Sequence, residues 1–169
     1  MSDAVVLGQK VLNPTPQYRY VRKVRSTADH PSSVALMSCW REHEAKGGMR
    51  MGRDIPSRAL VKLLPHILIT EAVDDWQDAR IRLAGTALLE RFGRDIAGSL
   101  ATQIYADDLE GIKFLLQHQR RAMEVREPCV VDTRIFLDGM EMMHLEIVLL
   151  PIYSPDGNDI WNLVGAFRF

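Results

Sequence analysis

Polar and apolar positions alternate along residues 79–83, which is the pattern of a β-strand with one buried face. Residues 67–73 are rich in β-branched and apolar side chains, a composition that also favours a strand. The five residues between them, 74–78, are mostly acidic or polar and predict a turn. We therefore expect these two segments to form an antiparallel hairpin.

Helical patterns follow this hairpin. Thr86 is a candidate N-cap for a short helix over 87–92, and Gly93 stands where a left-handed residue would end that helix. A longer helix is predicted to begin at Asp107, with Glu110 three residues later as in a capping box. Its apolar residues recur every three or four positions, so one face of this helix should cover an apolar surface.

Two more helices are predicted before the hairpin. The first begins at Ser32 or Ser33 and ends before the glycine pair 47–48. The second is predicted over 54–65, between an Asp-Ile-Pro start and a terminal proline. The main apolar side chains of the first helix are Leu36, Met37 and Trp40.

The C-terminal third of the chain has the pattern of three strands. They are predicted over 129–137, 140–150 and 160–169, separated by an Asp-Gly turn and by the polar segment 154–159. Strands that are segregated from helices in this way predict an α+β fold with a mainly antiparallel sheet.

Charged residues are distributed unevenly along the chain. Residues 1–31 carry five Lys or Arg against two Asp and contain three prolines, whereas the whole chain of 169 residues has a net charge of −1. We therefore expect a flexible basic arm over 1–31, in which 18–25 can form a short extended piece, and a folded domain over 32–169, with its core at 66–169. The two cysteines, the lack of an export signal and the lack of a long apolar run favour a cytoplasmic protein.

Four short phrases carry a resemblance to a known family. They are Arg53-Asp54-Ile55-Pro56, Leu63-Leu64-Pro65-His66, Arg82-Leu83-Ala84-Gly85-Thr86 and Phe92-Gly93-Arg94-Asp95-Ile96-Ala97-Gly98. With the order of elements, they resemble a PAS-like family of unassigned function found mainly in alphaproteobacteria. The resemblance runs from about Ser33 to the C-terminus.

This resemblance implies a five-stranded antiparallel sheet with a helical crossover on one face and N-terminal helices. An apolar cavity is expected between the crossover and the sheet, although which sheet face lines it stays open. PAS domains bind small ligands, dimerise or pass on a signal. We therefore expect a non-catalytic sensory or regulatory module that binds an apolar small molecule, a protein partner or both, as a homodimer.

Candidate residues follow from these expectations. The candidates for the ligand pocket are Phe92, Tyr105, Leu115, Gln119 and Met143. The candidates for the dimer interface are Leu36, Met37 and Trp40, because the helix that carries them could cover the second sheet face in its own chain or in a second copy.

Cofactor and metal chemistry find little support. PAS proteins that bind haem use an axial histidine, and His118 lies on the long predicted helix, but at the margin of its apolar face. Residues 86–125 contain no cysteine for covalent flavin photochemistry. The five histidines are scattered and none lies three or four residues from another, so no metal site is predicted. No cofactor is required by the sequence.

Three other features of the sequence bear on function. The basic run 18–25 interleaves tyrosines with arginines and could contact nucleic acid, but a solvated charged tail is the more common meaning of such a run. A small-molecule enzyme is disfavoured because no set of polar residues converges on a reaction. His144 and Glu146, with Arg134 opposite, are predicted to form a polar network on the solvent side rather than an acid–base site.

Overall fold

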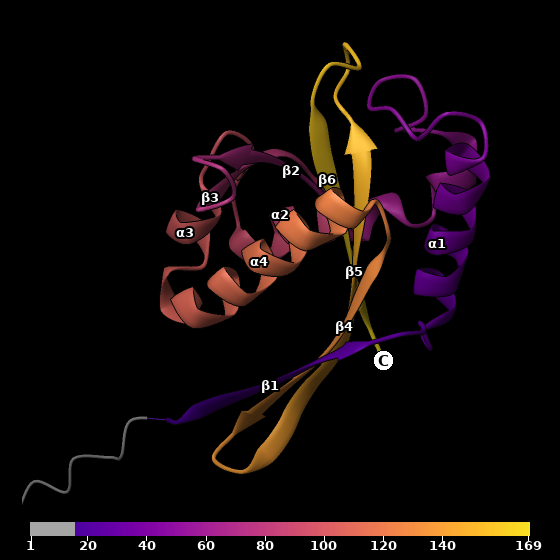
Figure 1. Ribbon diagram of the computed structural model, residues 1–169. Helices are drawn as coiled ribbons and strands as arrows, with labels where there is room; N and C mark the ends of the chain where they lie inside the picture. The colour runs from indigo at the N-terminus through magenta and orange to yellow at the C-terminus, as the bar shows by residue number, and fades with distance from the viewer. Residues whose placement is uncertain (1–15) are drawn as a thin grey trace, which may run out of the picture.

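A six-stranded antiparallel sheet with helices on both faces makes up the fold in the computed structural model, which describes residues 16–169 (Figure 1). The strands are β1 (Tyr18–Arg25), β2 (Ile67–Val73), β3 (Asp78–Ala84), β4 (Cys129–Leu137), β5 (Met140–Tyr153) and β6 (Ile160–Arg168). The α-helices are α1 (Pro31–Glu44), α2 (Thr86–Phe92), α3 (Ala101–Ile104) and α4 (Leu109–Val125), and the 3₁₀ turns are η1 (Arg58–Leu60), η2 (Leu64–His66) and η3 (Ala106–Asp108). The strand order is β1-β4-β5-β6-β2-β3. The α+β class and the antiparallel sheet are confirmed, with six strands where five were expected.

The additional strand is β1, which lies inside the segment expected to be a flexible arm. It pairs with β4 along its whole length, from Tyr18 opposite Leu137 to Arg25 opposite Val130. The expectation of a flexible arm is wrong for 18–25, because the backbone groups of this segment find hydrogen-bond partners on the edge of β4. Residues 1–15 of the predicted arm lie outside the described residues.

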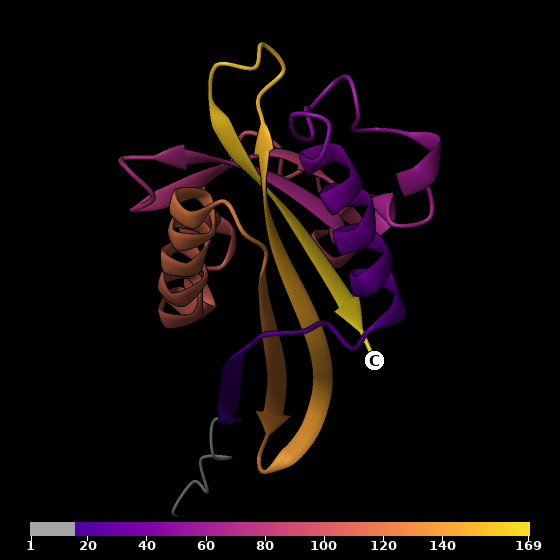
Figure 2. The ribbon, with the colours of Figure 1, turned by 45° about the vertical axis from the view of Figure 1, so that its right-hand side comes forward.

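The two faces of the sheet are covered by different parts of the same chain (Figures 1 and 2). On β2, Ile67 packs into the core beneath α1, while the next residue, Leu68, packs into the core beneath the crossover helices. Trp40 of α1 is buried in the first core, and its indole Nε1–H donates to the backbone carbonyl of Pro151 at 2.7 Å. Helices therefore cover both faces of the sheet. The expected cavity would lie on the face beneath the crossover helices.

The crossover runs from β3 through α2, α3 and η3 into α4. Gly93 ends α2 in the left-handed conformation with φ of 66°, as predicted. The first residue of α2 is Thr86, which is therefore not its N-cap. The N-cap of α4 is Asp108 rather than the predicted Asp107, since the Asp108 carboxylate accepts the backbone N–H of Gly111 at 3.1 Å.

The helix predicted over 54–65 does not form, and only the single turns η1 and η2 occur there. Ser57 is extended, with φ of −144° and ψ of 162°, and this interrupts any helix that starts at Asp54. The Asp54 carboxylate accepts the backbone N–H of Arg50 and the guanidinium of Arg53, each at 2.8 Å. It therefore stabilises the preceding loop and caps no following helix.

Candidate functional site

A cavity of about 160 Å³ lies between the crossover helices and the sheet. Its sheet side is lined by the apolar side chains of Leu68, Ala79, Ile135, Leu145, Ile147, Val164 and Ala166. Its helical side is lined by Leu88, Ala101, Ile112, Leu115 and Leu116. The sequence alone did not decide which face of the sheet lines the cavity. In the structure it is the face that carries Leu68 on β2 and Ile147 on β5.

Three polar side chains are buried in the wall of this cavity. The Thr70 hydroxyl donates to the Gln119 side-chain oxygen at 3.0 Å, so these two groups satisfy each other across the gap between β2 and α4. Thr133 of β4 is 3% exposed, and its hydroxyl has no partner among the described residues. A buried hydroxyl without a partner is costly, which makes Thr133 the unusual member of the three.

Strand β1 closes the cavity on one side with Tyr20 and Arg22. The Arg22 guanidinium forms an ion pair with the Asp108 carboxylate, and the two side chains are 14% and 20% exposed. Gly111 makes this approach possible, because a Cβ there would collide with both charged groups. Burial raises the pKa of Tyr20, and the charges of Asp108 and Asp107 add to this effect. The N-terminal strand is therefore tied to the first turn of α4 at the cavity.

The five predicted pocket residues divide into three that line the cavity and two that do not. Tyr105, Leu115 and Gln119 belong to its lining. Phe92 packs edge-on against the Tyr105 ring, at 5.5 Å between ring centroids, and so lies behind the wall. Met143 is partly buried farther along β5, opposite Ile135 on β4, and is not part of the lining. Burial raises the pKa of Tyr105, and the nearby charge of Arg91 opposes that shift.

The residues that sequence reasoning missed are Thr70, Thr133, Tyr20 and Arg22. The available signal for Thr133 was its position in a row of alternate residues on β4 that is otherwise apolar, with Val131 and Ile135 on either side. Nothing comparable pointed to Tyr20 and Arg22, because their place depends on the pairing of β1 with β4.

The three predicted dimer-interface residues are buried within this chain. Leu36, Met37 and Trp40 are 0%, 5% and 4% exposed and belong to the core between α1 and the sheet. They offer no surface to a second copy while α1 stays on its own sheet, so the interface prediction is corrected in this respect.

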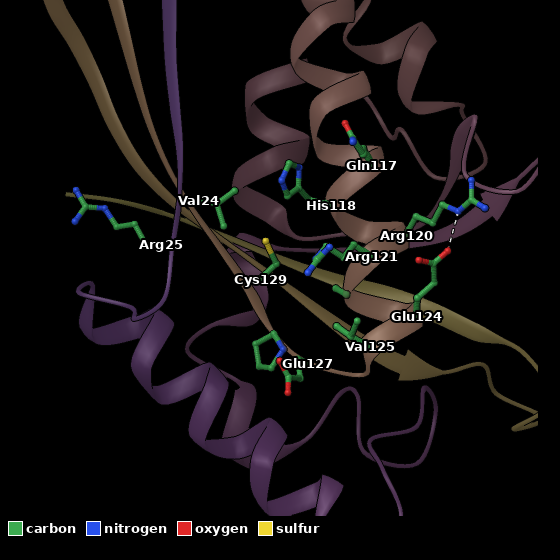
Figure 3. A pocket seen from close by; sticks show the side chains of 12 residues that line it. Val24, Arg25, Gln117, His118, Arg120, Arg121, Glu124, Val125, Glu127 and Cys129 are labelled. Carbon is green, nitrogen blue, oxygen red and sulfur yellow. Dashed lines mark hydrogen bonds and ion pairs between the residues drawn. The ribbon is translucent and has the colours of Figure 1, made fainter.

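A second, more open depression of about 810 Å³ runs between β1 and the C-terminal half of α4 (Figure 3). His118 lies in this groove and not in the cavity lining, with its Nδ1 2.8 Å from the carbonyl oxygen of Phe114. Arg120 is already engaged by Asp75 at 3.1 Å and by Glu124 at 3.0 Å. His118, the candidate haem ligand, therefore lies outside the cavity between the crossover helices and the sheet.

The polar cluster on β4 and β5 differs from the predicted network. His144 binds Asp132 at 2.7 Å, and Arg134 lies 3.7 Å from the same carboxylate. Glu146 is fully buried and instead accepts the backbone N–H groups of Asp29 and His30, each at 2.9 Å. The prediction of a solvent-side network is wrong for Glu146, because the β1–α1 connection covers that carboxylate and takes its hydrogen bonds.

A cysteine, a histidine and an aspartate also lie close together at the end of α1. The Cys39 sulfur is 3.8 Å from His43 Nδ1, and His43 Nε2 is 3.6 Å from Asp54. The same Nδ1 lies 2.8 Å from the Cys39 carbonyl oxygen, which can only accept, so this nitrogen carries the proton and cannot take one from the thiol. Burial raises the pKa of Cys39, and the charges of Glu42 and Asp54 raise it further. This arrangement favours an inert thiol.

Neither a metal-ligand cluster nor a membrane-spanning helix occurs among the described residues. Among residues 16–169, no three His, Cys, Asp or Glu side chains are placed to hold a metal ion. In the same part of the chain, no helix has the length and apolar character needed to cross a bilayer.

The fold and its cavity define a class of protein: a sensor-type domain whose antiparallel sheet carries a helical crossover over a largely apolar cavity. A family model for the PAS domain matches residues 28–167 of this chain. The chain therefore belongs to the PAS domain family. A search of curated proteins gives no match to it. Membership of this family supports a sensory or regulatory role.

Proposed function

We propose that this chain is a non-catalytic regulatory PAS module that binds a small apolar molecule in the cavity between the sheet and the crossover helices. The observation that carries the proposal is the cavity itself, which has an apolar lining and a few buried polar groups. Enclosed apolar spaces with a small number of fixed polar groups are typical of small-molecule sites. The volume of about 160 Å³ is close to that of an apolar protein cavity known to hold benzene.

Occupancy of the cavity could be transmitted through β1. Tyr20 and Arg22 line the cavity and also belong to the edge strand of the sheet. A ligand that displaces either side chain would disturb the ion pair between Arg22 and Asp108. The change would then reach the outer edge of β1, which has no neighbouring strand among the described residues. This edge is accessible to a partner molecule.

The experiment is a thermal-shift titration with benzene, alongside native mass spectrometry of the protein as purified. Bound ligand raises the melting temperature, because only the folded state binds it. Ala166→Leu, which adds three carbon atoms to the cavity wall, should abolish the shift, and the milder Ala166→Val should reduce it. Ala45→Leu, at an exposed position after α1, is the matched control and should leave the shift intact. An equal shift in all four proteins would refute binding in the cavity.

The proposal includes a homodimer or a protein partner that contacts the projecting end of the sheet. β1 and the β4–β5 hairpin extend beyond the helices (Figure 1). Tyr18, Met140 and Met142 lie there and are 60%, 69% and 47% exposed. Exposed apolar side chains that gather in this way are typical of contact surfaces.

Light scattering on a sizing column tests the dimer. Met140→Glu should shift a dimer to the monomer mass, while Val61→Glu, at an equally exposed apolar position elsewhere, should not. A monomer mass for the unmodified chain at high micromolar concentration would contradict the homodimer and leave a different protein as the partner.

The alternatives have less support. The basic segment 18–25 is a paired strand, and its Arg22 is bound to Asp108, so fewer of its charges are available to nucleic acid than a flexible arm would offer. The pair Cys39 and His43 does not support an enzyme, because burial raises the pKa of the Cys39 thiol, which disfavours the thiolate, and the imidazole nitrogen beside it is a donor. A cytoplasmic location stays a prediction of the sequence.

A further inference from the structure

The charges around the cavity balance one another. Its lining includes two arginines, Arg22 and Arg91, two carboxylates, Asp107 and Asp108, and the exposed imidazole of His66. Arg22 and Asp108 neutralise each other in an ion pair, and Arg91 and Asp107 are exposed. The buried polar groups of the wall are all uncharged. A charged ligand would lose its hydration here without gaining a buried counter-charge, so the cavity selects an uncharged molecule.

Thr133 adds a hydrogen-bonding requirement to the buried part of the cavity wall. Its side chain points to the crossover side of β4, as that of Val131 does two residues earlier, and its hydroxyl has no partner among residues 16–169. A buried hydroxyl that lacks a partner is destabilising, because it has lost its hydrogen bonds to water without replacing them. The other two buried polar side chains, Thr70 and Gln119, already bond to each other. The hydroxyl of Thr133 is therefore the buried hydroxyl of the wall that still lacks a partner in this part of the chain.

The volume limits the size of the ligand. A cavity of about 150 Å³ accommodates one benzene ring, and this cavity measures about 160 Å³. A molecule of one six-membered ring, or an aliphatic one of equal size, fits together with one small substituent.

We propose that the ligand is a small, uncharged, single-ring or equally compact aliphatic molecule with one hydroxyl or carbonyl group, which forms a hydrogen bond with the Thr133 hydroxyl. This inference rests on the proposed function, because it names the chemical class for the same cavity. Because a hydroxyl both donates and accepts, Thr133 can serve a ligand hydroxyl or a ligand carbonyl. The apolar walls hold the rest of the molecule.

The test is calorimetric titration of benzene, phenol and benzoate into three proteins: the unmodified chain, Thr133→Val and Thr133→Ser. Valine has nearly the shape of threonine and lacks the hydroxyl, whereas serine keeps it. The ratio of phenol affinity to benzene affinity should fall about tenfold in Thr133→Val, which corresponds to one net hydrogen bond of about 1.4 kcal/mol. The ratio should stay within about threefold in Thr133→Ser, and benzoate should bind none of the three proteins.

Each outcome separates this inference from the proposed function. If benzene and phenol both bind and Thr133→Val leaves their ratio unchanged, the role of Thr133 is refuted, and the cavity stands as the site. Benzoate binding as tight as that of phenol would refute the selection of uncharged molecules. If neither benzene nor phenol binds any of the three proteins, and neither raises the melting temperature of the unmodified chain above that seen with Ala166→Leu, the proposed function itself fails.

Discussion

The ion pair between Arg22 and Asp108 should hold β1 against the cavity with a measurable coupling energy. Double-mutant cycles give couplings of about 0.2–1 kcal/mol for exposed ion pairs and about 1.5–7 kcal/mol for close, desolvated charge pairs. The two side chains are 14% and 20% exposed, which lies between these limits, so we expect a coupling of about 2 kcal/mol. Asp108 also caps α4, and the replacement must keep that function.

A double-mutant cycle with Arg22→Met and Asp108→Asn isolates the pair. Methionine keeps the apolar stem of the arginine, and asparagine caps helices about as well as aspartate. Urea denaturation of the four proteins gives the coupling free energy. Hydrogen exchange should show faster exchange of the β1 amides in both single variants.

The matched control is the pair between Arg120 and Glu124, which is 45% and 61% exposed. Its coupling should be about 0.3–0.5 kcal/mol, as for other exposed pairs four residues apart on a helix. A coupling for Arg22 and Asp108 no larger than this control would refute the claim that their ion pair fastens β1 to α4.

Three further predictions concern buried groups. Glu146→Gln should lower the free energy of unfolding by about 2–3 kcal/mol, because glutamine has only one acceptor oxygen for the N–H groups of Asp29 and His30; a loss under about 0.5 kcal/mol in urea denaturation would contradict this. Burial raises the pKa of Tyr105 above its ordinary 10.0, so as the pH rises through that value the unfolded chain ionises first and stability is lost; Tyr105→Phe should lose less stability than the unmodified chain between about pH 8 and pH 11, and equal losses would disprove the assignment. Trp40→Phe should cost about 2 kcal/mol, by removing a buried hydrogen bond, and leave the oligomeric mass unchanged; a lower mass at unchanged stability would instead support an interface at α1.

Local patterns in the sequence were sufficient for most of the fold. Strand alternation, the Asp-Gly turn at 138–139 and the left-handed Gly93 depend on neighbours in the chain, and each of these elements occurs where it was predicted. The helix over 54–65 was wrong for a local reason that the pattern concealed. Aspartate often caps helices, but the Asp54 carboxylate accepts hydrogen bonds from the preceding residues Arg50 and Arg53.

Strand β1 could not be predicted with the same confidence from composition. Residues 18–25 are basic and lie next to a proline-rich stretch, which is typical of a solvated arm. The same residues also include two tyrosines and two valines, residue types that favour a strand when a free sheet edge is present. The edge is supplied by β4, more than a hundred residues later, so only the tertiary structure decides between the two.

The sequence predicted where the candidate site lies better than it predicted the polar groups of that site. Tyr105, Leu115 and Gln119 lie at the cavity because the crossover folds back over the sheet as the resemblance implied. Thr133 was missed because its importance comes from the lack of a hydrogen-bond partner, which no sequence pattern reveals. Phe92 is one layer away, since its ring packs on Tyr105 and not toward the open space.

The most direct test of a binding cavity on the crossover side of the sheet is a titration of the methyl-labelled protein with phenol, followed by NMR. The account predicts that the methyl signals of Leu68, Leu115 and Ile147 shift with ligand concentration, because these side chains line the cavity. The signals of Leu36 and Ile152, buried beneath α1 on the opposite face, should stay in place. Shifts confined to Leu36 and Ile152, or no shift at any of the five, would contradict the account.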